Sequence, residues 1–388
     1  MSGRVSRWFY SVAAPALFLS WHPGARLVGA TLQTDQFIGA AGCQSSSCHG
    51  GAGAKRSQFL TWVKEDFHSR AYAVLVTARS ARMAETLGLP AAQTSSRCTI
   101  CHSPLQAVGP ARLTKTAQVD EGVSCENCHG AAGPWLRGHT RKDWTYATGV
   151  GAGMRDLRNF YVRANTCVAC HQNLEPDLLA AGHPELVFEL DGQSVAEPKH
   201  WHDADPSGGA RAWLVGQAVA LRELTWMAES KEAADENATA RREALVWLLA
   251  KTTADQTRLP LIDPPHGTGD PARFAIERER ADLLARQAAS IPWDDQRTEA
   301  ILGALAGTGS EFVAAPSPSA ELLFARATRL VLALDRLARA RTPAALTPAT
   351  AAALQTLFED VRDRPDFAPG KFSADLAIFR TTLETAPE

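Results

Sequence analysis

Residues 98–102 read Cys98-Thr99-Ile100-Cys101-His102, and the same pattern returns at Cys125-Glu126-Asn127-Cys128-His129 and at Cys167-Val168-Ala169-Cys170-His171. Two thiols at this spacing reach the two vinyl groups on one edge of a porphyrin. The histidine that follows the second thiol turns under the ring and binds its iron. Each of these three segments is therefore a motif for covalent c-type haem attachment.

A fourth segment, Cys43-Gln44-Ser45-Ser46-Ser47-Cys48-His49, has four residues between its thiols instead of two. Such longer spacings occur in some multihaem cytochromes, and we expect both thiols to carry the haem. The alternative is that Cys43 is a free thiol and that only Cys48 is linked, although a lone reactive thiol would be a liability in an exported protein. With this segment the sequence predicts four covalently attached haem c groups.

The chain contains 8 cysteines, and this number alone would also allow disulfides, redox thiols or zinc sites. Disulfides would make four neighbouring Cys-His pairs accidental, and structural zinc sites do not place histidine directly after cysteine in four separate pairs. Haem is therefore favoured. The predicted attachment points are Cys43, Cys48, Cys98, Cys101, Cys125, Cys128, Cys167 and Cys170, and the predicted proximal ligands are His49, His102, His129 and His171.

Composition limits the remaining possibilities. A chain of 388 residues with 45% hydrophobic and 21% charged residues is long enough for two globular domains and too apolar to be disordered. The net charge of −2 provides no basic field for nucleic acid, so charged partners must be recognised by local patches. All cysteines lie between Cys43 and Cys170, which separates a metal-binding region from a long region without cysteine.

Seven further histidines could supply the sixth ligand of each iron, and three of them are well placed. His68 follows the first motif by 19 residues, His139 follows the third by 10, and His183 follows the fourth by 12. We expect these three to be distal ligands, which leaves one iron with an open site for a small ligand. The alternative is that His200, His202 or a methionine fills that site. The other candidates, His22 and His266, are expected to play no part.

These residues resemble the tetrahaem cytochrome c-554 family and related multihaem cytochromes of the hydroxylamine oxidoreductase lineage. The matching segments run from Cys43 to Gly50, from Gly122 to Gly130 with His139, and from Cys167 to His171 with Ala181-Gly182-His183-Pro184. The resemblance covers roughly residues 36–205 and implies closely stacked haems that pass electrons between redox partners.

The resemblance also implies a ligand set. His139 would serve the first haem, His68 the third and His183 the fourth, and the haem of Cys98 and Cys101 would keep an open site opposite His102. This chain departs from the family in its widened first motif and in its long cysteine-free region, which leaves the physiological role open.

The N-terminus has features of an export signal. Arg4 and Arg7 precede an apolar stretch from Trp8 to Trp21, and Val28-Gly29-Ala30 offers small residues before a cut. We expect residues 1–30 to be a signal peptide and the protein to be periplasmic, because bacteria attach c-type haem on that side of the membrane. An uncleaved membrane anchor is the alternative.

The predicted fold is mostly α. Residues 36–205 would form a tetrahaem cytochrome c domain with little regular sheet, in which the porphyrins serve as the core. Residues 206–388 would form a bundle of five to seven helices, because leucine and alanine recur there at helical spacing. The expected helices include 210–230, 237–253, 274–289 and 351–361, and another that Ser317-Pro318 would start.

Two main functions are compatible with these features. The first is electron transfer between redox partner proteins, including a membrane-associated donor or acceptor, with the bundle as a docking or dimerisation surface. The alternative is an oxidoreductase of nitric oxide, nitrite, hydroxylamine or a sulfur species. In that case the haem of His102 would be the catalytic site and His200 or His202 the proton donor. A gas sensor is a third hypothesis, but no output module is recognisable.

Overall fold

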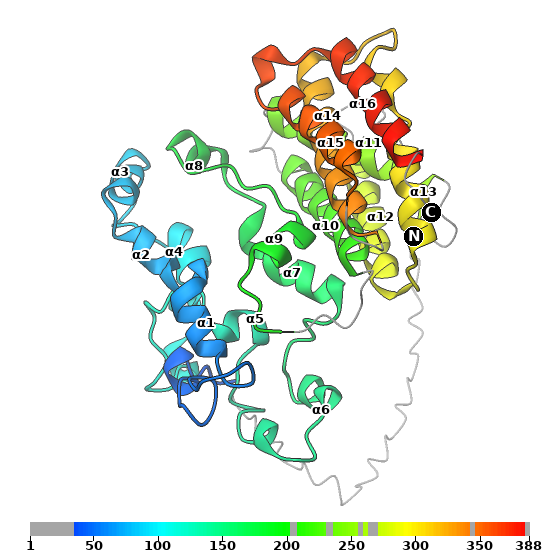
Figure 1. Cartoon of the computed structure of the whole chain (residues 1–388). Helices are drawn as coiled ribbons and strands as arrows, with labels where there is room; N and C mark the ends of the chain where they lie inside the picture. Colours follow the sequence, from blue (N-terminus) through cyan, green and yellow to red (C-terminus); the bar gives the residue numbers. More distant parts are fainter. Residues whose placement is uncertain are drawn as a thin grey trace, which may run out of the picture. The chain divides into compact units, whose positions relative to one another are not determined.

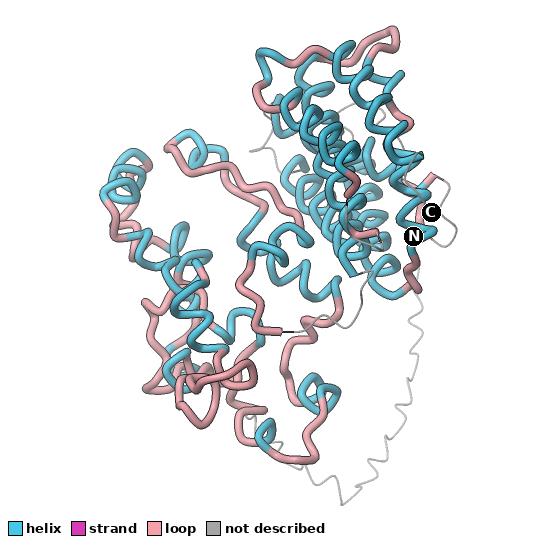
Figure 2. Tube along the Cα trace, viewed as in Figure 1, coloured by secondary structure: helices cyan, strands magenta, loops and turns pink. Residues whose placement is uncertain are grey.

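Helices and loops make up the whole described part of the chain. The computed structural model describes residues 35–201, 208–229, 236–254, 259–262, 271–341 and 346–384. Within them, Figure 2 draws helices and loops and no strand, and extended residues pair only at an isolated parallel bridge between Phe37 and Leu113. The prediction of a mostly α fold is therefore confirmed. The predicted signal peptide, His22, His202, His266 and the predicted domain boundary between residues 205 and 206 lie outside the described residues. None of the described helices is both long and apolar enough to cross a bilayer.

The first part of the chain folds into short helices joined by long loops, as the tube in Figure 2 shows. Its α helices are α1 (Gln58–Glu65), α2 (Ala71–Leu75), α3 (Ala78–Thr86), α4 (Ser96–His102), α5 (Cys125–His129), α6 (Tyr146–Gly151), α7 (Phe160–His171), α8 (Pro176–Ala180) and α9 (Leu190–Ala196). Single 3₁₀ turns lie between them at Ala40–Gly42, Phe67–Arg70, Pro104–Ala107, Pro110–Arg112 and Gly138–Thr140.

The helical segment that ends at Thr86 is divided into three pieces, Phe67–Arg70, α2 and α3. The Thr77 side chain accepts a hydrogen bond from the Ser80 amide at 3.3 Å and so starts α3 as a new helix. Interruptions of this kind keep the helices too short to bury a continuous apolar face.

The apolar core of this part is small. Its own cluster of buried apolar side chains consists of Leu75, Ala84 and Ala92. So few buried side chains could not stabilise a domain of this size in water. This observation agrees with the expectation that porphyrins fill its interior.

The second part is a bundle of longer helices (Figure 1). They are α10 (Gly208–Glu229), α11 (Glu236–Thr253), α12 (Pro271–Ser290), α13 (Asp295–Ala306), α14 (Ala320–Arg339), α15 (Pro348–Asp360) and α16 (Pro369–Glu384), with 3₁₀ turns at Gly309–Phe312 and Arg364–Asp366. Helix α10 is buried along most of its length, including Trp213 and Leu221, and packs against α11, α12 and α14.

Local start signals account for several of these helices. Thr347 caps α15 by accepting a hydrogen bond from the Thr350 amide at 3.1 Å, and Pro348 lies in the first turn. Helix α14 begins slightly later than expected, because Ser319 rather than Ser317 is its cap. Helices α13 and α16 were not among the predicted ones, although Asp294 caps α13 in the ordinary way.

Helix α7 connects the two parts. The Tyr161 hydroxyl donates a hydrogen bond to Asp282 of α12 at 2.7 Å, and Arg222 of α10 bridges Asp282 at 2.6 Å and Asn165 at 2.6 Å. Phe160, Ala164 and Val168 of α7, together with residues before α9, belong to the same apolar core as the bundle. The bundle therefore holds α7, which carries the fourth motif at its C-terminal end.

The Asp191 carboxyl, in α9, should make the stability of the fold depend on pH. Arg336 Nε lies 3.3 Å from the Asp191 carboxylate, but burial and the nearby Glu189 raise the pKa of Asp191 to about 7. The folded state therefore binds more protons than the unfolded state between about pH 4 and 7, so this group makes stability fall as the pH rises through that range. Asp191→Asn should raise the thermal midpoint at pH 8 by several degrees and change it little at pH 4.

Differential scanning calorimetry at both pH values checks this prediction. The exposed Asp366 provides the control, since Asp366→Asn should leave the midpoint nearly unchanged at either pH. A midpoint of Asp191→Asn that is lower than that of the wild type at pH 8 would contradict the predicted effect of burial.

Candidate haem sites

Three of the four motifs lie at the C-terminal ends of helices. The last residue of α4 is His102, the last residue of α5 is His129, and the last residue of α7 is His171. Two cysteines three residues apart lie on the same side of a helix, so both thiols of each motif can face one porphyrin edge. None of the eight cysteines forms a disulfide.

The widened first motif folds so that its extra residues loop out. The His49 amide donates a hydrogen bond to the Cys43 carbonyl at 3.3 Å, while the amides of Cys48 and Gly50 donate to the Ser45 carbonyl at 2.8 and 3.0 Å. In a helical motif, the histidine amide bonds the carbonyl of the first cysteine in the same way. Cys43 therefore occupies the position of a first haem cysteine.

Each motif histidine faces a histidine from elsewhere in the chain. The ring centres are 6.2 Å apart for His49 and His139, 6.3 Å for His102 and His183, 6.3 Å for His129 and His200, and 5.9 Å for His171 and His68. Two imidazoles that each bind one metal ion through Nε2 at about 2 Å have ring centres about 6 Å apart. The separation in all four pairs is therefore the one that an iron atom between the rings requires.

Hydrogen bonds at the other ring nitrogen support the same conclusion. In five of these histidines Nδ1 lies 2.5–3.3 Å from a carbonyl or amide oxygen, which can only accept a hydrogen bond. The acceptors belong to Gln58, Ala71, Leu136, Pro184 and Pro198. Nδ1 must then carry the proton, which leaves the Nε2 lone pair free for a metal.

The protonation of the buried rings also suits metal binding. Burial lowers the pKa of His129 to about 4, and it lowers the pKa values of His102 and His171 as well. These imidazoles are therefore neutral near pH 7, as a ligand must be. His68 differs, because hydrogen bonds to Asp66 and Glu197 raise its pKa to about 10. Both carboxylates lie at Nδ1, so binding of a metal at Nε2 would have to release the proton on that nitrogen.

The pairing differs from the one that the family resemblance implies. His139 faces His49, as implied, but His68 faces His171 instead of His129. His183 faces His102, at the site expected to be open, and His200 faces His129. The distal rings come from loops whose path depends on tertiary packing, so distance along the sequence does not determine their partners.

Contacts between thiols show which motifs are neighbours. A hydrogen bond with Cys125 lowers the pKa of the Cys43 thiol, so the first and third motifs lie side by side. In the same way, Cys170 lowers the pKa of Cys101, which joins the second and fourth motifs. Burial and the nearby Cys167 raise the pKa of Cys128 to about 12, which joins the third and fourth. The motifs therefore follow one another in the order first, third, fourth, second.

Glu126, inside the third motif, has a structural role that the sequence analysis did not predict. Its buried carboxylate accepts hydrogen bonds from the amides of Ile38 at 2.9 Å, Gly39 at 2.7 Å and Ala132 at 2.6 Å. It thereby holds the segment that leads into the first motif against the third. An acidic residue within an attachment motif was the one signal that could have suggested it.

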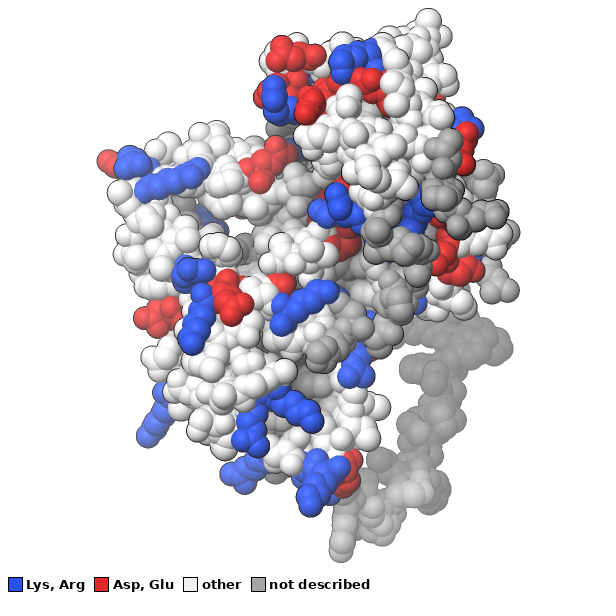
Figure 3. Space-filling model, viewed as in Figure 1, with Lys and Arg blue, Asp and Glu red and all other residues white. Residues whose placement is uncertain are grey.

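Charge is unevenly distributed over the described surface. Figure 3 shows Lys and Arg side chains gathered at the lower end of the view, with few Asp or Glu side chains beside them. The segment around His139 is rich in exposed basic residues, namely Arg137, Arg141, Lys142 and Arg158.

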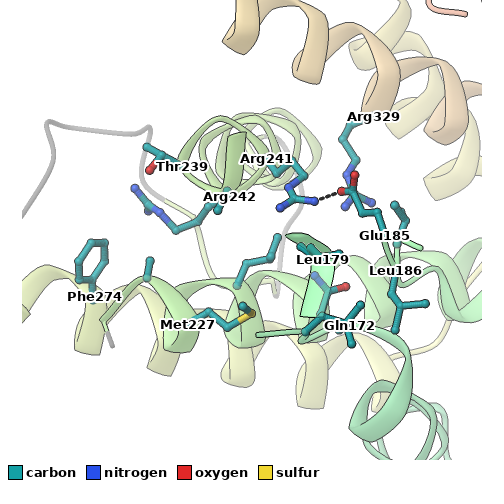
Figure 4. Close-up of a pocket in the computed structure, with 15 residues that line it drawn as sticks. Gln172, Leu179, Glu185, Leu186, Met227, Thr239, Arg241, Arg242, Phe274 and Arg329 are labelled. Carbon is teal, nitrogen blue, oxygen red and sulfur yellow. Dashed lines mark ion pairs between the residues drawn. The ribbon is translucent and has the colours of Figure 1, made fainter. Parts of the chain in front are cut away.

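A separate pocket lies where the segment from Gln172 to Val187 meets α10, α11 and α14 (Figure 4). Three arginines reach it, but each is matched by a carboxylate: Arg241 by Glu185, Arg242 by Glu277 and Arg329 by Glu189. The pocket contains none of the paired histidines.

The geometry of the first motif makes a chemical prediction. Both Cys43 and Cys48 should form thioether bonds, so the haem-bearing peptide should contain no thiol that iodoacetamide can alkylate after denaturation. Cys43→Ser should keep the haem through Cys48 but show one thioether fewer by mass spectrometry. Alkylation of Cys43 in the wild-type peptide would contradict the prediction.

Comparison with known proteins agrees with these observations. A family model described as cytochrome c554 and c-prime matches residues 42–130, a segment that contains the first three motifs. The fourth motif and the rings of His139, His183 and His200 lie beyond the matched segment. No curated protein and no solved structure matches the chain significantly. Members of this family are multihaem c-type cytochromes with covalently bound haem. Over residues 42–130, this chain is therefore similar to the cytochrome c554 and c-prime family.

Proposed function

We propose that this protein is a periplasmic tetrahaem cytochrome that transfers electrons between redox partner proteins. The observation that carries the proposal is the set of four histidine pairs with ring centres 5.9–6.3 Å apart. An iron held by two histidines has no free coordination position, so it exchanges electrons without binding a substrate.

The residues of this chain have separate tasks in that function. The cysteines of each motif would hold a porphyrin covalently, and the paired histidines would bind its iron. Backbone carbonyls such as those of Ala71 and Leu136 hold the ring orientation by accepting from Nδ1. Each bound haem would supply a one-electron ferric/ferrous couple.

The neighbouring motifs support a single path for electrons. Thiol contacts link the first site to the third and the fourth to the second, and Cys167 of the fourth motif lies near Cys128 of the third. Electrons would therefore enter at one end of this series, near the first or the second motif, and leave at the other. The exposed basic residues around His139 suit a partner with an acidic surface near the first site.

The alternative function, an oxidoreductase at an open haem, has less support. His183 lies opposite His102, where a substrate would have to bind. His200, expected as a proton donor or a ligand, lies opposite His129. His202, the other expected proton donor, lies outside the described residues.

Electron paramagnetic resonance of the ferric protein tests the proposed ligation. All four haems should be low-spin in the wild type, and the ferrous protein should not bind nitric oxide rapidly. His68→Ala, His139→Ala, His183→Ala and His200→Ala should each convert one haem in four to high spin. His266→Ala serves as the control and should leave the spectrum unchanged.

The pairing itself can be read from the same spectra. The rings of His68 and His171 are nearly perpendicular, at 89°, whereas those of His49 and His139 are nearly parallel, at 11°. Perpendicular rings leave two iron d orbitals nearly degenerate and give a strongly anisotropic low-spin signal. We expect His68→Ala to remove such a signal and His183→Ala to retain it. A high-spin haem in the wild type that binds nitric oxide would contradict the proposed function.

A further inference from the structure

Two carboxylates meet the same ring nitrogen of one predicted haem ligand. His68 Nδ1 lies 3.1 Å from Asp66 Oδ1 and 3.3 Å from Glu197 Oε2. The carboxylates come from positions far apart in the sequence, and neither belongs to an attachment motif. The three groups are close enough to hold a metal ion of their own. However, a carboxylate that accepts from Nδ1 of a metal-bound histidine is a common arrangement, and it explains the cluster without a second metal.

His68 is distinguished by this contact. The five other rings with an identified Nδ1 acceptor meet neutral carbonyl or amide oxygens. Asp66 is only 5% exposed, so water screens its charge weakly. Asp66 also accepts a hydrogen bond from the His68 amide at 2.8 Å, which fixes the ring relative to the carboxylate.

We propose that Asp66 and Glu197 give the haem of Cys167 and Cys170 the lowest reduction potential of the four. This inference rests on the proposed function, in which His68 and His171 bind one iron. A carboxylate that accepts the Nδ1 proton increases the electron donation of the imidazole to the metal and brings a negative charge close to it. Both effects stabilise the ferric state relative to the ferrous state, so the one-electron reduction becomes less favourable.

Two arginines act in the opposite direction but less directly. Arg155 and Arg163 lie near Cys167 and favour a negative charge there. Their guanidinium groups donate to backbone carbonyls, Arg155 to Asn127 and Cys128 and Arg163 to Leu157. The carboxylates act on the iron through its own ligand, so their effect should dominate.

The position of this site gives the inference a functional meaning. In the order of motifs, the fourth site lies between the third and the second. With a low reduction potential at the fourth site, electron transfer to it from either neighbouring site would be energetically uphill. Electrons at the two ends of the series would then stay separate until a partner accepts them.

Potentiometric titration of the whole protein, followed by optical and paramagnetic resonance spectra, tests the proposal. The variants are Asp66→Asn, Glu197→Gln and the double variant. Asparagine also caps helical turns, so Asp66→Asn keeps the backbone contact while it removes the charge. One midpoint of the four should rise in each single variant. In the double variant the reduction equilibrium should change at least tenfold, which is about 59 mV for one electron. The signal that shifts should be the strongly anisotropic one.

Two control variants make the test specific. Gln58→Glu would place a carboxylate beside His49 Nδ1, which Gln58 Oε1 now meets at 3.0 Å, and should lower the midpoint of the haem with parallel rings. Asp143→Asn removes an exposed carboxylate in the same part of the chain and should leave every midpoint unchanged.

Other outcomes would overturn the inference. Four unchanged midpoints in the double variant, with all haems low-spin, would show that the carboxylates do not tune the iron. High-spin haem in that variant would show that they only hold the ring in place. If His68→Ala itself creates no high-spin haem, the proposed ligand set fails, and that result is distinguishable from both of these.

Discussion

The separation of facing imidazoles is the constraint on which the rest of the structure depends. Four pairs of rings, contributed by different helices and loops, all lie close to the distance that one shared metal ion would impose. Hydrophobic packing does not account for this regularity, because the part of the chain that contains the rings has a small apolar cluster of its own. The arrangement follows if haem is the core around which this part folds, so that attachment of the cofactor and folding are coupled.

Ordinary backbone chemistry prepares the rings for this role. Carbonyl oxygens of Ala71, Leu136, Pro184 and Pro198 accept hydrogen bonds from Nδ1 and so select the tautomer with a free Nε2. Glu126 holds the first and third motifs together through three amides. The acceptors at Nδ1 do not belong to the attachment motifs, and Asp66 and Glu197 differ from the carbonyl acceptors in bringing charge as well as orientation.

The attachment motifs and the fold class could be predicted from sequence because both are local. A motif occupies five to seven consecutive residues, and helix starts such as Thr347-Pro348 are set by neighbouring side chains. The partners of the motif histidines are not local, since His68 and His171 are 103 residues apart. Spacing ranked His68, His139 and His183 above His200, and the apparent shortage of one ligand followed from that ranking. Asp66 and Glu197 are brought together only by the tertiary fold.

The helical bundle affects the sites through the segment between α7 and α10. This segment contains His183 and His200, which face the second and third motifs, and Phe188 and Leu190 within it are fully buried in the bundle core. The bundle also holds α7 and the fourth motif through Tyr161 and Arg222. Three of the four sites thus depend on residues that pack against the bundle. The match to the cytochrome c554 and c-prime family ends at residue 130, before any of these residues. The ring that faces His102 and the two segments that pack against the bundle therefore all belong to the part of the chain beyond the family match.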